Sequence, residues 1–357
     1  MTVKKREVRG RYRKVDLFSA SYYKGATVVP FRAWQVAVAM KKKNVLSVIA
    51  ADGGVDHRAL GRLLSVVEND RDAGEDILAT YFRDPERTQV IGITGPPGAG
   101  KSTLADCLIG ELRKEGKTVA VVAIDPSSPF TGGALLGDRI RMSAHATDPK
   151  VFIRSMASRG SLGGLAPATF DVVNLLRSVG FDVIIVETVG VGQSEIDVLA
   201  IADTVLLTLV PGLGDDVQVL KAGIMEIADL FVVNKADRDG KERLLAEIRM
   251  ILDLNHDRFD WVPPVCETVA TEHRGVREVM ACIARHFEYV RVNREKVRRP
   301  KIARQLEKMV SDKISRRVLD FFNQNDRFDT WIDTALSGEK NVYQIVKEIE
   351  RYLPTAE

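Results

Sequence analysis

The sequence has little cysteine and little histidine, with three cysteines and five histidines among 357 residues. The cysteines are Cys107, Cys266 and Cys282, which are widely spaced, and no C-x-x-C pair occurs. This spacing argues against a structural zinc site and is typical of reduced thiols. Clusters of metal-ligating residues are also missing, so neither a structural zinc site nor a nickel site is expected.

Long hydrophobic runs are missing as well. No apolar run reaches about 18 residues, and the N-terminus lacks an apolar signal core. We therefore expect neither a membrane span nor secretion, and a cytoplasmic protein, or one of the mitochondrial matrix if the source is eukaryotic. The net charge of +3 indicates no special partner, and neither nucleic acid nor membrane is expected as one. With 45% hydrophobic and 28% charged residues, the chain has the composition and length of a globular protein of two domains.

One stretch stands out against this background. Gly95 to Ser102 reads GPPGAGKS and matches the phosphate-binding pattern G-x-x-x-x-G-K-[ST] in full. An apolar run precedes it and a helical pattern follows it, so strand, loop and helix come in the order that a phosphate cradle needs. Lys101 is predicted to neutralise the β and γ phosphates, and Ser102 to bind magnesium. The predicted phosphate-binding residues are Gly95, Pro97, Gly98, Ala99, Gly100, Lys101, Ser102 and Thr103.

From residue 88 to 270 apolar strands alternate with helical segments. This pattern predicts an α/β fold with a doubly wound, mostly parallel sheet, whose ligands bind at the carboxyl ends of the strands. The predicted strands are Val90 to Thr94, Val119 to Ile124, Val183 to Val186, Val205 to Val210 and Leu230 to Val233.

The second predicted strand runs into a loop rich in proline, glycine and serine that carries Asp125 and Asp138. Magnesium on a nucleotide favours one or two carboxylates besides phosphate oxygens, so both are candidate ligands. Either could instead be a turn-forming aspartate. Arg139 and Arg141 follow, and they could pair with phosphate or with acidic residues of a partner.

The third predicted strand ends in ETVGVGQSE, which begins at Glu187 and has the Glu-x-x-Gly form of a switch that senses a γ phosphate. Glu187 is expected to reach the magnesium ion or its water shell, and Gly190 to offer a backbone N–H to the γ phosphate. Val191 stands where many small GTPases place a water-orienting glutamine, so slow intrinsic hydrolysis is expected. Gln193 lies two residues further on and would need a rearrangement to act.

The fifth predicted strand runs into NKAD, and this motif indicates the base. Its residues Asn234, Lys235 and Asp237 are predicted to bind guanine, because Asp237 can accept hydrogen bonds from N1 and N2 of that base. Adenine would leave the carboxylate partly unpaired, at a cost of roughly 1 to 3 kcal/mol. Val269 and Ala270 lie in a stretch that could supply the backbone contact to guanine O6, although the usual central serine is Val269 here.

Together, GPPGAGKS, DPSSPFTGG with LGDR, ETVGVGQSE, PGLGDDVQVLKAG and NKAD resemble the MeaB/ArgK family of P-loop GTPases, over roughly residues 45 to 290. The resemblance implies a GTPase that binds GTP, GDP and Mg²⁺. It also implies a chaperone that gates cofactor loading of an adenosylcobalamin-dependent acyl-CoA mutase, of the methylmalonyl-CoA mutase type, and protects it from inactivation. An older description of the same family is a kinase of an amino-acid transport system.

The resemblance also assigns roles to residues. It implies that Gly212 to Asp229 forms an additional switch, in which Lys221 reaches the nucleotide when the partner is bound. The alternative is that Lys221 is an exposed lysine on a helix and does not reach the nucleotide. The residues implied to surround the magnesium ion are Ser102, Asp125, Asp138 and Glu187, and those implied to act in catalysis are Lys101, Glu187 and Lys221.

The two ends of the chain have a different character. Residues 1–40 form a basic segment, for which a flexible tail is favoured over a mitochondrial address or a docking arm. Residues 41–87 are predicted as a helical lead-in, with one apolar stripe of Leu60, Leu63, Leu64 and Val67. Residues 271–357 are predicted as a helical extension, which either packs on its own domain or forms the dimerisation arm of a homodimer. Its predicted apolar positions are Ile302, Leu306, Met309, Val310, Ile314, Val318 and Phe321, and then Val342, Ile345, Val346, Ile349 and Leu353.

Two other functions remain open. A metabolic or transport-associated kinase would use the same phosphate loop, but it needs an acceptor site with a general base, and no motif announces one. A metal-delivery GTPase would share the Glu-x-x-Gly switch, but it should carry clusters of histidine or cysteine.

Overall fold

The computed structural model describes residues 55–82, 87–125, 145, 147–157, 167–188, 201–212, 228–254, 259–324 and 327–349. The chain divides into two compact units, one of residues Phe31–Ser311 and a second that contains Asp312–Glu357. The predicted basic segment over residues 1–40 lies outside the described residues. Among the helices that the structure describes, none is long and apolar enough to cross a membrane.

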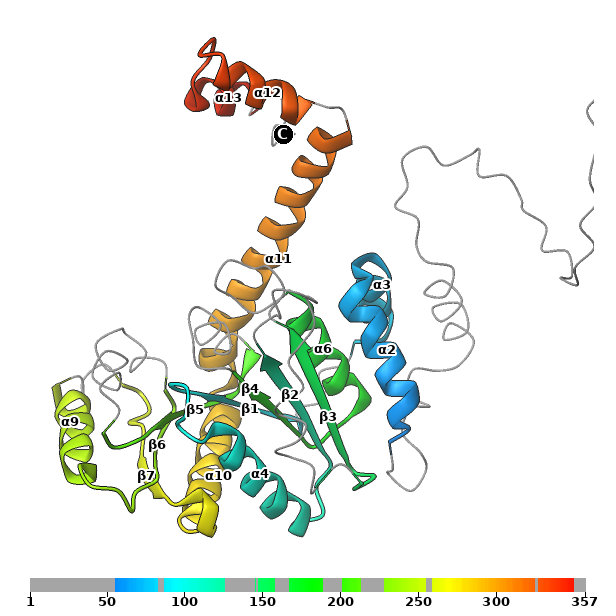
Figure 1. Ribbon diagram of the computed structural model, residues 1–357. Coiled ribbons are helices and arrows are strands. Elements are labelled where there is room, and N and C mark those ends of the chain that lie inside the picture. Colours follow the sequence, from blue (N-terminus) through cyan, green and yellow to red (C-terminus); the bar gives the residue numbers. More distant parts are fainter. Residues whose placement is uncertain are drawn as a thin grey trace, which may run out of the picture. The chain divides into compact units, whose positions relative to one another are not determined.

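A seven-stranded parallel sheet forms the centre of the first unit, in the order β3-β2-β4-β1-β5-β6-β7 (Figure 1). Residues of β1, β4, β5 and β6 are buried throughout, because helices cover both faces of the sheet. The predicted α/β fold is thus confirmed. The strands are β1 (Gln89–Thr94), β2 (Val119–Asp125), β3 (Val151–Ala157), β4 (Val183–Glu187), β5 (Thr204–Leu209), β6 (Leu230–Asn234) and β7 (Val265–Thr268).

The five predicted strands are confirmed to within about one residue at each end, and β3 and β7 were missed. β3 reads VFIRSMA, in which Arg154 and Ser155 break the apolar run. β7 has only four residues, VCET, and two of these are polar. Neither segment carries the continuous apolar run that marks the central strands.

The helices form two layers. α2, α3 and α6 pack on one face over β1, β2 and β4, and α9 packs on the same face over β5 and β6. α4 and α10 cover the opposite face (Figure 1). The bounds are α2 (His57–Asn69), α3 (Arg71–Tyr81), α4 (Lys101–Lys114), α6 (Pro167–Val179), α9 (Lys241–Leu254) and α10 (Val276–Val292).

The predicted apolar stripe of the lead-in is confirmed in α2. The Asp56 carboxylate caps this helix by accepting from the backbone N–H groups of Arg58 and Ala59 at 3.0 and 2.9 Å. All four predicted stripe residues are buried against α6 and the sheet. The spacing of about 3.6 residues per turn therefore identified the buried face correctly.

The C-terminal part consists of α11 (Arg294–Gln324), α12 (Arg327–Leu336) and α13 (Val342–Ile349). The predicted stripe on α11 remains largely open to solvent in this single chain: Ile302, Leu306 and Ile314 are each more than half exposed. In α13 Ile345 is buried, whereas Val342 and Val346 are exposed. Among the described residues of the two stripes, most of the apolar side chains are therefore exposed.

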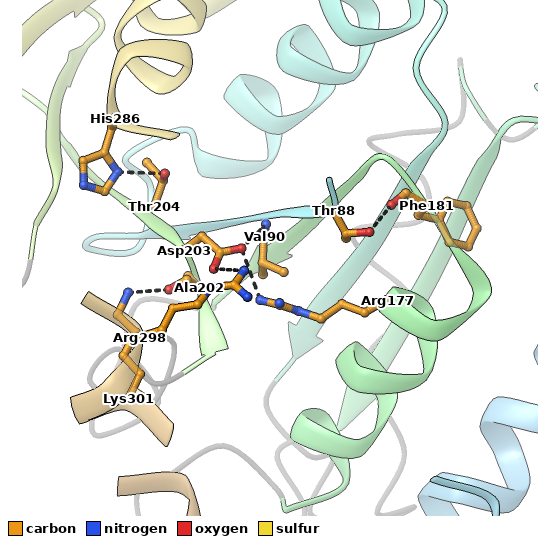
Figure 2. Close-up of polar contacts among 10 residues, drawn as sticks. All are labelled: Thr88, Val90, Arg177, Phe181, Ala202, Asp203, Thr204, His286, Arg298 and Lys301. Carbon is orange, nitrogen blue, oxygen red and sulfur yellow. Dashed lines mark hydrogen bonds and ion pairs between the residues drawn. The ribbon is translucent and has the colours of Figure 1, made fainter. Parts of the chain in front are cut away.

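A buried carboxylate ties the first turns of α11 to the amino end of the sheet (Figure 2). Asp203, just before β5, accepts from the backbone N–H of Val90 at 2.9 Å and from Arg177 of α6 at 3.2 Å. Arg298 of α11 donates to the other oxygen of Asp203 at 3.1 Å. The network thereby holds β1, the strand that leads into the phosphate loop.

Nearby groups extend this contact. The ammonium group of Lys301 donates to the carbonyl of Ala202 at 2.7 Å, and burial lowers the pKa of Lys301. The Thr204 hydroxyl and Nδ1 of the buried His286 lie 2.9 Å apart. Thus α10 contacts the first residue of β5, Thr204, and α11 contacts the two residues that precede this strand.

We expect Asp203→Ala to lower the free energy of unfolding by about 3 to 5 kcal/mol, because it removes a buried carboxylate that pairs with the guanidinium groups of Arg177 and Arg298. Urea unfolding followed by circular dichroism measures this loss. Asp260→Ala is the matched control, since Asp260 and Lys296 form an ion pair whose side chains are 61% and 64% exposed, and exposed pairs contribute little. Equal losses in the two variants would contradict the anchoring role of Asp203.

Candidate functional site

The predicted phosphate loop lies between β1 and α4. Gly95 has φ +133°, and a Cβ there would come within 2.1 Å of the Thr208 carbonyl oxygen. Gly100 has φ +86° and is the N-cap of α4, where a Cβ would lie 2.4 Å from Nδ2 of Asn234. Both positions therefore require glycine, and the loop closes tightly against β5 and against the residue that ends β6. The first backbone N–H groups of α4 point toward this loop, as in helix N-termini that bind phosphate.

Lys101 folds back over the loop. Its Nζ donates to the carbonyls of Gly95 and Pro96 at 2.7 and 3.0 Å, and the residue is only 6% exposed. The positive charge therefore lies inside the loop, beside the N-terminus of α4. Pro97 and Gly98 form the exposed rim of the same turn.

Ser102 and Glu187 meet at the carboxyl edge of the sheet. The Ser102 hydroxyl donates to Oε1 of Glu187 at 2.5 Å, and both residues are buried. A hydroxyl oxygen and a carboxylate oxygen are hard donors of the kind that Mg²⁺ prefers, so this pair fits a magnesium ion on a bound nucleotide. Asp125 ends β2 at the same edge of the sheet.

Other predicted residues fall outside the described part of the chain. Asp138, Gly190, Val191 and Lys221 are among them. The structure describes the first two residues of the Glu-x-x-Gly segment, Glu187 and Thr188. The backbone N–H of Thr188 donates to the Ile93 carbonyl at 3.1 Å. This bond continues the pairing of β4 with β1 one step beyond Glu187.

Asn234 joins the two halves of the predicted nucleotide site. Its Nδ2 donates to the Ala99 carbonyl in the phosphate loop at 2.9 Å. Its Oδ1 accepts from the Thr268 hydroxyl at 3.1 Å and from the Ala270 backbone N–H at 3.2 Å. One buried amide thereby fixes the phosphate loop relative to the segment that follows β7.

The remaining NKAD residues point in different directions. Lys235, in the left-handed conformation with φ +54°, donates through Nζ to the Gly98 carbonyl at 2.8 Å. The Ala236 N–H donates to the Thr268 carbonyl at 3.0 Å, which links the motif to β7. Asp237 is exposed, as a carboxylate that binds an entering base must be. Val269 and Ala270 are buried, and Ala270 begins a short 3₁₀ helix.

The residues Asn234, Ala236, Asp237, Thr268 and Ala270 form the predicted guanine corner. Sequence reasoning missed two contacts of this corner. The Thr268 hydroxyl orients Asn234, and the Cys107 thiol of α4 donates to the Ala270 carbonyl at 3.1 Å. Thr268 ends the strand beside β6, and a search for polar residues at every strand end would have found it. Cys107 lies 163 residues from Ala270 along the chain, and no local pattern links the two.

This arrangement has the parts of a nucleotide site. A glycine-rich turn, a buried ammonium group and a helix N-terminus suit phosphates. The Ser102 hydroxyl and the Glu187 carboxylate suit the accompanying magnesium ion. The exposed carboxylate of Asp237 suits a base that carries adjacent N–H donors. All of these lie at the carboxyl end of the parallel sheet, where ligands bind in such folds.

Comparison with known proteins agrees with this geometry. A family described as "Methylmalonyl Co-A mutase-associated GTPase MeaB" matches residues 60–323. A Pyrococcus abyssi protein described as a GTPase is 54% identical over 269 residues, which cover 74% of this chain and 83% of that protein. The GTPase ArgK of Escherichia coli is 35% identical over 297 residues, which cover 80% of this chain and 88% of that protein.

Two further similarities extend the comparison. The methylmalonic aciduria type A homolog of Caenorhabditis elegans, a mitochondrial protein, is 35% identical over 276 residues, with 72% of this chain and 69% of that protein covered. The crystal structure of an LAO/AO transport system kinase matches with a TM-score of 0.62 at 23% identity, over 92% of this chain and 99% of the other. The structural match supports the fold.

Proposed function

The chain belongs to the MeaB family of GTPases, and we propose that it uses GTP to gate cofactor loading of an adenosylcobalamin-dependent acyl-CoA mutase and to protect that enzyme. The observation that carries this proposal is the family match, which extends from α2 through the sheet to the end of α11. The similarity to a methylmalonic aciduria type A homolog supports a mutase of the methylmalonyl-CoA type.

The site supports guanine nucleotides as the ligand. In this proposal the phosphates lie in the turn from Gly95 to Gly100 and against Lys101, whose ammonium group exchanges loop carbonyls for phosphate oxygens. Asp237 accepts from N1 and N2 of guanine, and the Ala270 segment, held by Asn234, lies against the base. Asn234 contacts both the phosphate loop and the Ala270 segment. It would therefore hold the two parts of the site at the spacing that one guanine nucleotide requires.

The chain's own groups have distinct tasks in hydrolysis. Lys101 stabilises negative charge on the transferring phosphoryl group, because its cation is already buried at the loop. Ser102 and Glu187 would hold magnesium, together with Asp125 and Asp138. When bound, the ion would neutralise charge on the β and γ phosphates.

We further propose that a partner completes the catalytic site. Val191 stands where a glutamine would orient the attacking water, so the chain alone lacks that group in its Glu-x-x-Gly segment. Lys221, in the segment between β5 and β6, is the proposed cation that partner binding moves to the nucleotide. From these two features we expect GTP hydrolysis to be slow in the isolated chain and faster when the mutase is bound.

A homodimer through α11 is also proposed. The apolar residues along this helix are exposed in the single chain, with Ile302 at 53%, Leu306 at 57% and Val310 at 54%. A repeat of apolar residues along a long helix is suited to packing against the same helix of a second copy. The second copy would bury a stripe that otherwise meets water.

We expect the mutase to raise the single-turnover rate of GTP hydrolysis by at least about 100-fold, since a supplied cation has comparable or larger effects in related switches. Lys221→Ala should lose most of this stimulation. Lys117→Ala is the control, because the Lys117 ammonium group pairs with Glu115 at the surface. The assay follows γ-labelled GTP, with and without mutase, under saturating magnesium.

Three results would count against the proposal. Equal rates with and without the mutase exclude partner gating. Equal stimulation of wild type and Lys221→Ala removes Lys221 from the mechanism. Label that appears in a small acceptor instead of inorganic phosphate indicates a kinase.

A further inference from the structure

Two thiols lie together in the wall of a cavity beside the Ala270 segment. The cavity has a volume of about 660 Å³ and is formed by β7, α10 and the end of the NKAD motif. Cys266 of β7 and Cys282 of α10 line it together with Arg285, and so do Ala236 and Thr268 of the proposed guanine corner. Each cysteine is 6% exposed, and the cavity that both residues line is a route for a small solute.

Two hydrogen-bond donors converge on the sulfur of Cys282. The Cys266 thiol donates to Cys282 Sγ at 3.4 Å, and Nη2 of Arg285 donates to the same atom at 3.0 Å. A thiol proton and a guanidinium group both stabilise negative charge on the accepting sulfur. Burial, followed by the hydrogen bond to Cys282, raises the pKa of Cys266 to about 12. Cys266 therefore remains the protonated donor, and Cys282 is the sulfur that accepts both hydrogen bonds.

We propose that Cys266 and Cys282 form a reversible disulfide when the protein meets a peroxide, and that this bond closes the loop that carries the guanine corner. The effect on nucleotide exchange rests on the guanine site proposed above, whereas formation of the bond does not. Free thiols at both positions are the reduced form of this pair.

The chemistry balances with the peroxide as the only oxidant. The Cys282 thiolate attacks one peroxide oxygen, the O–O bond breaks, and sulfenic acid and hydroxide form; the hydroxide takes a proton to become water. Cys266 sulfur then attacks Cys282 sulfur, and its own proton leaves with the displaced hydroxide as a second water. The sulfurs must approach from 3.4 Å to a bond length of about 2 Å.

The loop between the two cysteines contains the guanine corner. They are 16 positions apart, and Thr268 and Ala270 lie between them. Within the loop, Val269 and Arg274 exchange backbone hydrogen bonds at 3.1 and 3.3 Å, which forms a short hairpin. A bond across the base of this hairpin restricts its opening. We therefore expect release of a bound guanine nucleotide to slow several-fold in the oxidised protein.

The test uses the full-length protein, treated with hydrogen peroxide and then alkylated. Peptide mapping by mass spectrometry should find Cys266 joined to Cys282, with loss of the mass of two hydrogen atoms and full recovery after dithiothreitol. Cys282→Ser should abolish the cross-link. Cys107→Ser is the matched control, since it removes the other buried thiol and should retain the cross-link. Sulfinic acid at Cys282 without a cross-link would overturn the proposal.

Release of a fluorescent GDP analogue provides the second readout. The oxidised wild type should release it several-fold more slowly than the reduced protein, and Cys282→Ser should show no change. A cross-linked protein with an unchanged release rate would overturn the predicted effect on the loop. Failure of the reduced protein to bind GDP would instead refute the proposed guanine site, and the peptide map would still decide whether the thiols pair.

Discussion

Replacing Asp237 with asparagine is expected to move the base preference of the site from guanine to xanthine. Guanine presents two adjacent donors, N1–H and the 2-amino group, and a carboxylate accepts from both. The asparagine amide offers one acceptor and one pair of donors, so one of its N–H groups would face a guanine N–H group. Xanthine has a carbonyl oxygen in place of the 2-amino group, and that oxygen accepts from the amide.

The size of the effect follows from the hydrogen bonds that are lost. A hydrogen bond to a charged group contributes about 1.5 to 3 kcal/mol. Asparagine replaces one of the two with a donor facing a donor and makes the other a weaker neutral hydrogen bond, so we expect GDP affinity to fall by roughly 100-fold. The structure favours a specific change in recognition over unfolding, because Asp237 is exposed and lies in a turn after β6.

Calorimetry with GDP, XDP and ADP measures this change in wild type and Asp237→Asn. Asp239→Asn is the matched control, because it makes the same substitution at an exposed position two residues further along the same turn. In wild type, GDP should bind far more tightly than ADP. A variant that keeps its GDP affinity, or a wild type that binds ADP and GDP equally, would remove Asp237 from base recognition.

The parts of this molecule that could be predicted from sequence are those that a local pattern determines. The phosphate loop needs positive φ at Gly95 and Gly100, a local backbone demand that glycine meets readily, so its pattern can be recognised in the sequence, whereas its close contacts with Thr208 and Asn234 come from distant segments. The central strands are continuous apolar runs, because they are covered on both faces. The stripe of α2 follows directly from the helical period.

The missed features depend on contacts between distant segments. β7 is a short edge strand whose place is fixed by pairing with β6 and by packing against α10, and its four residues carry no signal of their own. Cys266 and Cys282 look like isolated cysteines along the chain, and only the packing of α10 on β7 brings the sulfurs together. The bridging role of Asn234 likewise needs the relative positions of β1, β6 and β7. Sequence indicated that Asn234 binds guanine, but it did not indicate that the same amide holds the phosphate loop.

Lys101→Ala should reduce the rate of GTP hydrolysis by roughly two to three powers of ten, which is the usual cost of removing one preorganised group that stabilises transition-state charge. The ammonium group is buried and already held by the carbonyls of Gly95 and Pro96, so little reorganisation is needed when phosphate replaces them. The variant should also bind GTP more weakly, because the phosphates lose their cation.

The matched control for this prediction is Lys114→Ala. Lys114 lies in the last turn of the same helix, with a side chain 67% exposed, and pairs with Glu111 at the surface. The Lys114→Ala substitution removes the same charge from α4 but leaves the phosphate loop unchanged, so the rate of hydrolysis should stay close to that of wild type. Single-turnover hydrolysis at saturating GTP isolates the chemical step from binding, and thermal unfolding of both variants checks that α4 remains folded. If Lys101→Ala hydrolyses GTP as fast as Lys114→Ala under these conditions, the buried ammonium group does not stabilise the transferring phosphoryl group, and its two carbonyl contacts serve only to close the loop.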